Sequence, residues 1–173
     1  EIMALFLSEN DVEQLLTMPL ALGAVEAAHR DLSIGQAFDE PRQRTRLPQT
    51  TLHILQGALP QLDVIGYKAY TSNRSGVRFL VYLYRASTGS LRAVLEADRL
   101  GMMRTGAAAG VATRWLARSD ARVAGVFGAG WQAEGHLEAI AAVRPLQRIK
   151  VYARHAERLA AFCTRMSERL ALE

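Results

Sequence analysis

Residues 122–134 place the strongest constraint on what this chain can fold into. They read RVAGVFGAGWQAE: an apolar run over 123–127, short enough for a buried parallel strand, then a glycine turn, and then the start of a helix expected over 131–143. A strand, a glycine turn and a helix in this order open a dinucleotide-binding fold. Gly128 allows the tight turn, Gly130 lets the backbone approach a pyrophosphate, and Ala133 takes the third small position. A purely structural turn is the alternative, because small residues also occur at ordinary turns.

The composition fits a globular protein and argues against several other classes. Half of the 173 residues are hydrophobic, 22% are charged, and the net charge is +4, which is ordinary for a folded domain. The basic residues are scattered, so no nucleic-acid surface is indicated. No apolar run approaches the roughly 20 residues of a membrane span, so no membrane contact is expected. The single cysteine, Cys163, is expected to pack as a small hydrophobic side chain, and the expected location is a reducing cytoplasm.

The first hundred residues predict short helices followed by an antiparallel sheet, an α+β arrangement. A capping box over residues 8–11 indicates a short helix, and a second helix is expected over 20–32. Apolar or alternating segments bounded by turn residues predict strands at 42–47, 51–55, 64–70, 77–83 and 91–97. We expect Asp98 to cap a long helix that ends at about Ala117.

A dense run of small residues, Thr105–Ala112, lies in the middle of this long helix. Gly106 and Gly110 each weaken a helix by up to about 1 kcal/mol relative to alanine, so the close approach of a neighbour is the expected reason for them. The sequence leaves open whether that neighbour is a strand, another helix or a cofactor.

The C-terminal part continues the dinucleotide-binding pattern with a strand over 148–152 and a helix over 157–170. The predicted fold class is therefore α/β: an N-terminal α+β region, residues 1–118, followed by the first half of a Rossmann-type domain, residues 119–173. Because such a domain ordinarily needs several more parallel strands, we expect the sequence to be truncated.

Three cations on ordered elements are the candidate binding residues. Arg44 lies on the first expected strand, Lys68 on the third, and Arg104 on the long helix beside its small residues. Arginine offers a two-pronged donor and lysine a point charge, and together they would fix the carboxylate of an amino or imino acid. The alternatives are a lysine whose stem packs on the sheet while its tip reaches water, and a solvated helix arginine. The four histidines are dispersed and form no cluster with metal-ligand spacing, so no metal is expected.

Taken together, these motifs resemble those of the ornithine cyclodeaminase/mu-crystallin family. The matching stretches run through almost the whole chain; they are Arg44–Pro48, Gly66–Lys68, Thr88–Gly89, Met103–Ala108 and Gly128–Ala133. The resemblance implies an NAD(P)-dependent oxidoreductase that acts on a small amino acid or cyclic imino acid, by cyclising ornithine to proline with loss of ammonia or by reducing a ketimine. Family members are typically homodimers whose N-terminal region, here residues 1–118, supplies the dimer sheet and the substrate pocket.

The resemblance also implies roles for individual residues. Arg44, Lys68 and Arg104 would hold the substrate carboxylate, and Arg104 would also lie near the cofactor. The residues that would lie along the pyrophosphate are Gly128, Ala129, Gly130, Trp131 and Gln132. The family's catalytic aspartate falls beyond residue 173, so no catalytic residue is assigned and the chain alone is expected to be inactive.

Two departures from the family pattern bear on specificity. After the second strand the sequence reads YARH, without the acid that ordinarily binds the adenine ribose of NAD. Arg154 would instead meet a 2′-phosphate, which favours NADP(H), although a surface arginine is the alternative. Phe79 stands where the family has a hydroxyl near the cofactor, which argues against strict ornithine cyclodeaminase activity. Two rival functions remain open: a non-catalytic, mu-crystallin-like protein that binds a ligand or NADP, and an unrelated dinucleotide-domain dehydrogenase.

Overall fold

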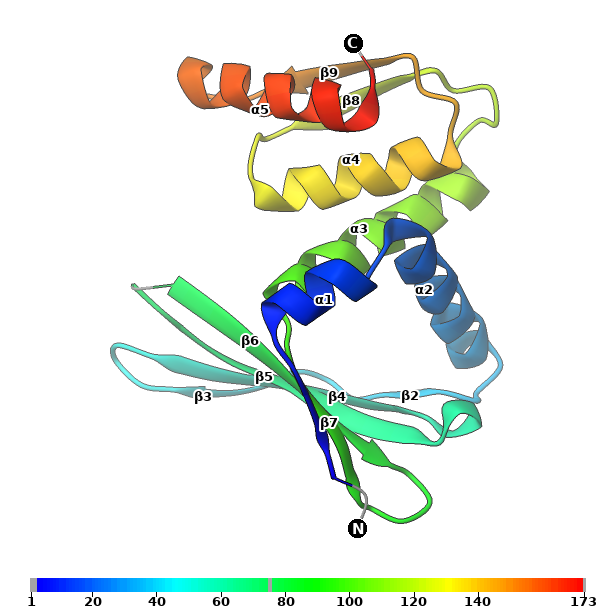
Figure 1. Cartoon of the computed structure of the whole chain (residues 1–173), viewed down its shortest axis with the longest axis vertical. Helices are drawn as coiled ribbons and strands as arrows, with labels where there is room; N and C mark the ends of the chain where they lie inside the picture. Colours follow the sequence, from blue (N-terminus) through cyan, green and yellow to red (C-terminus); the bar gives the residue numbers. More distant parts are fainter. Residues whose placement is uncertain (1–2, 75, 173) are drawn as a thin grey trace. The chain divides into compact units, whose positions relative to one another are not determined.

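A computed structural model describes residues 3–74 and 76–172 of the chain. It contains two compact units: unit 1 comprises residues 1–17 and 27–101, and unit 2 comprises residues 18–26 and 102–173. Figure 1 shows their elements coloured along the sequence. These units are defined by which residues pack together, whereas the division into residues 1–118 and 119–173 is a functional one and stays a prediction.

Unit 1 is built on a seven-stranded sheet with the strand order β1-β7-β6-β5-β4-β2, in which β3 also pairs with β4. The strands are β1 (Leu5–Leu7), β2 (Phe38–Asp39), β3 (Gln43–Arg46), β4 (Thr51–Leu59), β5 (Val64–Asn73), β6 (Gly76–Arg85) and β7 (Leu91–Glu96). Neighbouring strands are antiparallel, except that β1 runs parallel to β7. The predicted antiparallel sheet is confirmed, and β1 and β2 are strands that the sequence patterns did not predict.

The two faces of this sheet differ in exposure. The face that we call the inner face carries Ala93 and Leu95 of β7, which are buried. The opposite, outer face carries Phe6, Leu52 and Ile65, which are 63%, 37% and 47% exposed. Successive residues of a strand point to opposite faces, so the register assigns every strand residue to one face or the other.

The helices of the N-terminal part form largely as the sequence predicts. Helix α1 (Glu9–Leu15) begins with a capping box, in which Ser8 and Asp11 hydrogen-bond each other's backbone N–H groups at 2.8 and 3.3 Å. Helix α2 (Met18–Ser33) is slightly longer than predicted, and a short 3₁₀ turn, η1 (Pro60–Leu62), separates β4 from β5.

A long-range contact, rather than Asp98, caps helix α3 (Asp98–Leu116). The Glu9 carboxylate accepts the backbone N–H groups of the first two residues of α3. Asp98 is itself the first helical residue, and its Oδ1 accepts a hydrogen bond from the Phe79 N–H at 3.0 Å. The predicted cap is therefore wrong. The acceptor for the first N–H group of α3 is Glu9, 89 positions earlier in the sequence. A local sequence pattern does not reveal such a distant contact.

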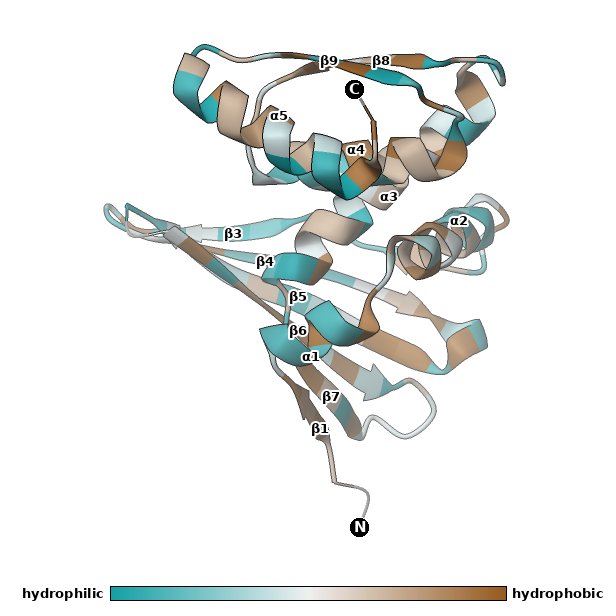
Figure 2. Ribbon diagram, turned by 45° about the horizontal axis from the view of Figure 1, so that its top comes forward, coloured by the Kyte–Doolittle hydropathy of each residue, from teal (hydrophilic) through white to brown (hydrophobic). Residues whose placement is uncertain are grey.

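Unit 2 contains the predicted strand–helix–strand–helix pattern. Its elements are β8 (Val123–Phe127), α4 (Trp131–Val143), β9 (Arg148–Tyr152) and α5 (Ala156–Leu170), and the two strands are parallel. Hydrophobic side chains of both helices pack against the strands; the buried ones are Ala133, Leu137, Phe162 and Met166. Figure 2 shows polar and apolar residues alternating along α5, as expected for a helix with one buried side. The first half of a Rossmann-type domain is confirmed.

The small residues of α3 are explained by another helix. A Cβ atom added at Gly106 would overlap the carbonyl oxygen of Gly135 in α4, and one at Gly110 would lie 2.9 Å from the Cβ of Ala139. Of the three neighbours that the sequence left open, the structure identifies a helix.

Two further expectations differ from the structure. Cys163 is exposed while Phe162 is fully buried, because only one of two consecutive helical residues faces the strands. Strand β4 continues past the break expected at Gly57, because it pairs with β5 as far as Leu59. Within the described part of the chain, no helix is long and apolar enough to cross a lipid bilayer.

Candidate functional site

The inner face of the unit 1 sheet carries both Arg44 and Lys68. Arg44 of β3 is paired with His53 of β4, which is paired with Tyr70 of β5. Lys68 lies two residues from Tyr70 on the same strand, so its side chain leaves the same face. At about 4.8 Å between strands and about 3.4 Å per residue, the Cα atoms of Arg44 and Lys68 are roughly 12 Å apart. Two side chains of this length can both reach a small anion between them.

Lys68 is half-buried, and its ammonium lies over two aromatic rings. Its Nζ is 4.9 Å from the centroid of Phe79 and 5.5 Å from that of Tyr70, and these rings meet edge to face at 4.7 Å. Cations are attracted to ring faces within about 6 Å, so the rings help to hold the lysine tip in place. Phe79 therefore forms part of an apolar wall beside Lys68.

His53 belongs to the same surface, although the sequence patterns did not single it out. Its ring stacks on Tyr70 with centroids 4.4 Å apart, and its Nε2 hydrogen-bonds with Ser72 Oγ at 2.9 Å. Its Nδ1 is buried without a hydrogen-bond partner among the residues that the structure describes. Desolvation, and then the positive charges of three arginines in and beside β3, hold the pKa of His53 below its usual value.

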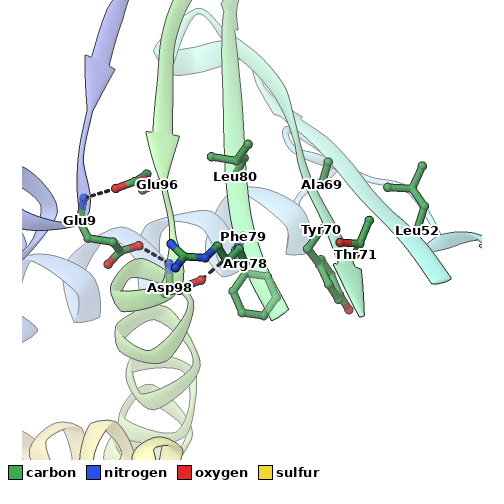
Figure 3. A pocket seen from close by; sticks show the side chains of 10 residues that line it. All are labelled: Glu9, Leu52, Ala69, Tyr70, Thr71, Arg78, Phe79, Leu80, Glu96 and Asp98. Atoms are coloured by element: carbon green, nitrogen blue, oxygen red, sulfur yellow. Dashed lines mark hydrogen bonds between the residues drawn. The ribbon is translucent and has the colours of Figure 1, made fainter. Parts of the chain in front are cut away.

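A cavity of about 430 Å³ lies near the end of the sheet where β5 turns into β6. Its volume is within the range of small-ligand pockets. Figure 3 shows the rings of Tyr70 and Phe79 on one side of their strands, with Ala69 and Leu80 on the other. The cavity therefore reaches around the end of the sheet, next to the rings that flank Lys68.

The acidic side chains of this cavity are occupied by backbone groups. Glu96 Oε2 accepts the N–H of Glu9 at 2.9 Å. Glu9 itself caps α3, and Asp98 accepts the N–H of Phe79 (Figure 3). These three acids join α1, β6, β7 and α3, and we assign them a structural role.

The glycine turn of unit 2 leaves the start of α4 open. Gly128 has φ of +108°, which glycine adopts readily, and its N–H donates to the carbonyl of Tyr152 at 2.7 Å. Gly130 is the N-cap of α4 and contributes no side-chain cap. A Cβ atom at either glycine would meet nothing within 4 Å. The positive end of the helix dipole thus faces open space, an arrangement that suits an anion.

A cavity of about 380 Å³ adjoins this turn at the carboxyl ends of β8 and β9, the edge at which α/β sheets bind ligands. Arg154 lines it, as do His155 and Arg158, which sequence reasoning did not select. Trp131 and Gln132 are exposed on the first turn of α4 and lie outside the lining of this cavity.

Arg104 is exposed on α3 and belongs to unit 2. Its grouping with Arg44 and Lys68 stays a prediction. Among residues 3–74 and 76–172, no three His, Cys, Asp or Glu side chains gather in a way that would hold a metal ion.

Comparison with known proteins finds relatives along the whole chain. The model of the Ornithine cyclodeaminase/mu-crystallin family matches residues 3–173. A Delta(1)-pyrroline-2-carboxylate reductase of Bacillus cereus is 31% identical over 176 residues, covering 95% of this chain and 54% of that protein.

Two solved structures share the fold. The Delta(1)-pyrroline-2-carboxylate reductase of Thermococcus litoralis in complex with NADH and L-proline gives a TM-score of 0.91 at 30% identity, covering 98% of this chain and 55% of that one. An archaeal alanine dehydrogenase dimer with bound NAD gives a TM-score of 0.90 at 30% identity, covering 96% of this chain and 53% of that one. The chain therefore spans about half the length of the relatives that it matches.

Proposed function

Because this chain belongs to the ornithine cyclodeaminase/mu-crystallin family, we propose that the protein carrying it is an NAD(P)-dependent oxidoreductase for a small amino acid or cyclic imino acid. The observation that carries the proposal is the open N-terminus of α4 beside the cavity at the carboxyl ends of β8 and β9. Among the family's reactions, ketimine reduction is favoured over ornithine cyclodeamination. The T. litoralis relative was solved with NADH and L-proline, and Phe79 leaves the site without the family's hydroxyl.

The residues of unit 2 fit a dinucleotide. The backbone of Gly128, Ala129 and Gly130 and the first N–H groups of α4 would face the pyrophosphate, with Trp131 and Gln132 beside it. The missing Cβ atoms of the two glycines leave the room that this approach needs. When bound, the nicotinamide supplies the hydride chemistry, and the chain's own residues determine which molecule is held against it.

The cofactor is proposed to be NADP(H). Arg154 and Arg158 line the cavity next to the glycine turn, and no acidic residue contributes to its lining. An acid would accept the ribose hydroxyls of NAD, whereas arginines donate to a 2′-phosphate. NADH and NAD are the cofactors of the T. litoralis and archaeal structures, so the preference rests on this chain's own residues.

The substrate carboxylate is proposed to bind Arg44, Lys68 and Arg104. Lys68 is the best placed of the three, because the rings of Tyr70 and Phe79 partly desolvate it and strengthen its attraction for an anion. Holding the carboxylate fixes the neighbouring carbon, which is the atom that a hydride must reach.

The protein is also proposed to form a homodimer through the outer face of the unit 1 sheet. That face exposes Phe6, Leu52 and Ile65, and apolar area of this kind is suited to a second copy of the chain. The archaeal alanine dehydrogenase is a dimer.

The function is tested by following oxidation of NADPH and NADH by the whole protein with Delta(1)-pyrroline-2-carboxylate, and ammonia release from ornithine in parallel. Lys68→Met keeps the length of the side chain and removes its charge, so we expect kcat/KM for the ketimine to fall about 100-fold. Arg30→Gln changes an exposed residue of α2 and should leave the rate unchanged.

A second outcome would favour the alternative function. If NADPH binds but no imino or amino acid is turned over, a non-catalytic, mu-crystallin-like binding protein is the better description. Absence of both turnover and nucleotide binding would contradict both functions.

A further inference from the structure

Arginines occupy every second position along the edge of the unit 1 sheet: Arg42, Arg44 and Arg46. The last two lie within β3, where Arg44 pairs with His53 and Arg46 with Thr51 of β4. Because residues two apart on a strand share a face, Arg46 lies on the inner face together with Arg44 and Lys68. The Leu47 N–H donates to the Thr50 carbonyl at 2.9 Å and closes the hairpin directly after Arg46.

These arginines carry more positive charge than one carboxylate needs. None of the three forms a salt bridge with an acidic side chain in the described chain. Like charges repel each other, and Arg44 and Arg46 are only about 7 Å apart along β3. Their charges also reach His53, whose pKa is lowered by desolvation and then by Arg44, Arg42 and Arg46. A bound anion would offset this repulsion.

The surroundings of Arg46 differ from those of Lys68. Thr51 is paired with Arg46 on one side and with Ser72 on the other. One half-buried hydroxyl therefore lies next to Arg46, and a second, whose oxygen also hydrogen-bonds with His53 Nε2, lies one strand further. Lys68 is instead paired with Leu55 and Val81. The inner face therefore changes along β4 and β5 from apolar and aromatic around Lys68 to hydroxyl-bearing and cationic around Arg46, with Arg44 between them.

We propose that Arg46, with the Thr51 and Ser72 hydroxyls, binds a second carboxylate, and that the substrate is a dicarboxylic amino or imino acid. The inference rests on the proposed function in one respect: Lys68 and Arg44 hold the α-carboxylate. Arg46 then binds the acid group of the substrate side chain, and its guanidinium can do so with two parallel hydrogen bonds.

Binding is tested apart from catalysis by calorimetric titration of the whole protein with succinate and with butyrate, which have four carbons each and differ in one carboxylate. We expect succinate to bind at least about tenfold more tightly. Arg46→Gln should abolish the difference, Arg46→Lys should restore part of it because it keeps the charge, and Arg30→Gln should retain it. The exposed position of Arg46 makes the variants compatible with folding, which a thermal melt checks.

Turnover is then measured with oxaloacetate plus ammonium against 2-oxobutyrate plus ammonium, with NADPH as reductant. We expect the dicarboxylic imino acid to have the higher kcat/KM, and Arg46→Gln to reduce it about tenfold or more while changing the monocarboxylic rate less than about twofold.

The outcomes separate this inference from the proposed function. Reduction of imino acids without dicarboxylate preference overturns the second carboxylate site and leaves the oxidoreductase function intact. Binding of succinate that depends on Arg46, without any turnover, supports the site and contradicts the function. Equal binding of succinate and butyrate overturns the inference.

Discussion

Arg154 follows β9 at the position where an acid would select NAD(H), and Arg158 lines the same cavity one helical turn later. We expect Arg154→Ala to raise the dissociation constant of NADPH about tenfold, because a charge-assisted bond to the 2′-phosphate is lost, and to leave that of NADH nearly unchanged. Fluorescence titration of both nucleotides measures the change. Arg122→Ala, an exposed arginine just before β8, is the control, and tighter binding of NADH than NADPH by the unmodified protein would contradict the preference.

Motifs identify some of the candidate residues from the sequence, and pairing identifies the others. Lys68 and Arg154 could be selected because each follows from local context: a lysine in an apolar strand, and an arginine where an acid is ordinarily found. His53 and Arg46 could not, because their significance depends on strand register. Only the pairing of β3 with β4 and of β4 with β5 places them on the face of Lys68.

At the scale of elements, the close contact between α3 and α4 leads us to expect that alanine in place of Gly106 destabilises the protein, whereas helix propensity alone predicts stabilisation. Alanine in place of a helical glycine ordinarily stabilises by up to about 1 kcal/mol. At Gly106 the added Cβ would overlap the carbonyl oxygen of Gly135, so Gly106→Ala should lower the free energy of unfolding by about 1–3 kcal/mol. Urea unfolding measures the effect.

A matched control lies on the same helix. A Cβ atom at Gly101 would meet nothing within 4 Å, so Gly101→Ala should be neutral or stabilising by up to about 1 kcal/mol. If both substitutions stabilise the protein, the close contact between α3 and α4 does not constrain the fold as the structure indicates.

Elements with a strong local signal could be predicted almost to the residue. The ranges of β8, α4 and β9 match the expected ones, because an apolar run, a glycine turn and a helical period each specify their own part. β1 and β2 were missed because they are two or three residues long and exist only through pairing with β7 and β4. The cap of α3 was misassigned for a related reason, since Glu9 reaches it only in the folded chain.

At the scale of the whole molecule, the order of the two regions could be predicted, whereas the way in which the chain groups into units could not. Residues 18–26 pack with the dinucleotide-binding elements although they lie far from them in sequence. Leu22 is an example, because it contacts the position of Gly110 in α3. The first part of helix α2 thus belongs to the unit whose other residues begin at 102.

The oligomeric state tests the outer face of the unit 1 sheet at this scale. Ile65 is 47% exposed on that face, close to stacked Tyr67 and Tyr82, whose ring centroids are 4.8 Å apart. If two copies pair through this face over at least about 1,000 Å², Ile65→Arg places two charges in an apolar interface and should raise the dimer dissociation constant at least about 100-fold. Sedimentation equilibrium at micromolar concentrations measures this dissociation constant.

Leu62→Arg is the control. It changes a more exposed residue, at 63%, on the η1 turn rather than on the sheet, and should leave the dimer intact. A protein that is monomeric at tens of micromolar before any substitution would contradict the interface, while an Ile65→Arg variant that remains dimeric would move it to another surface.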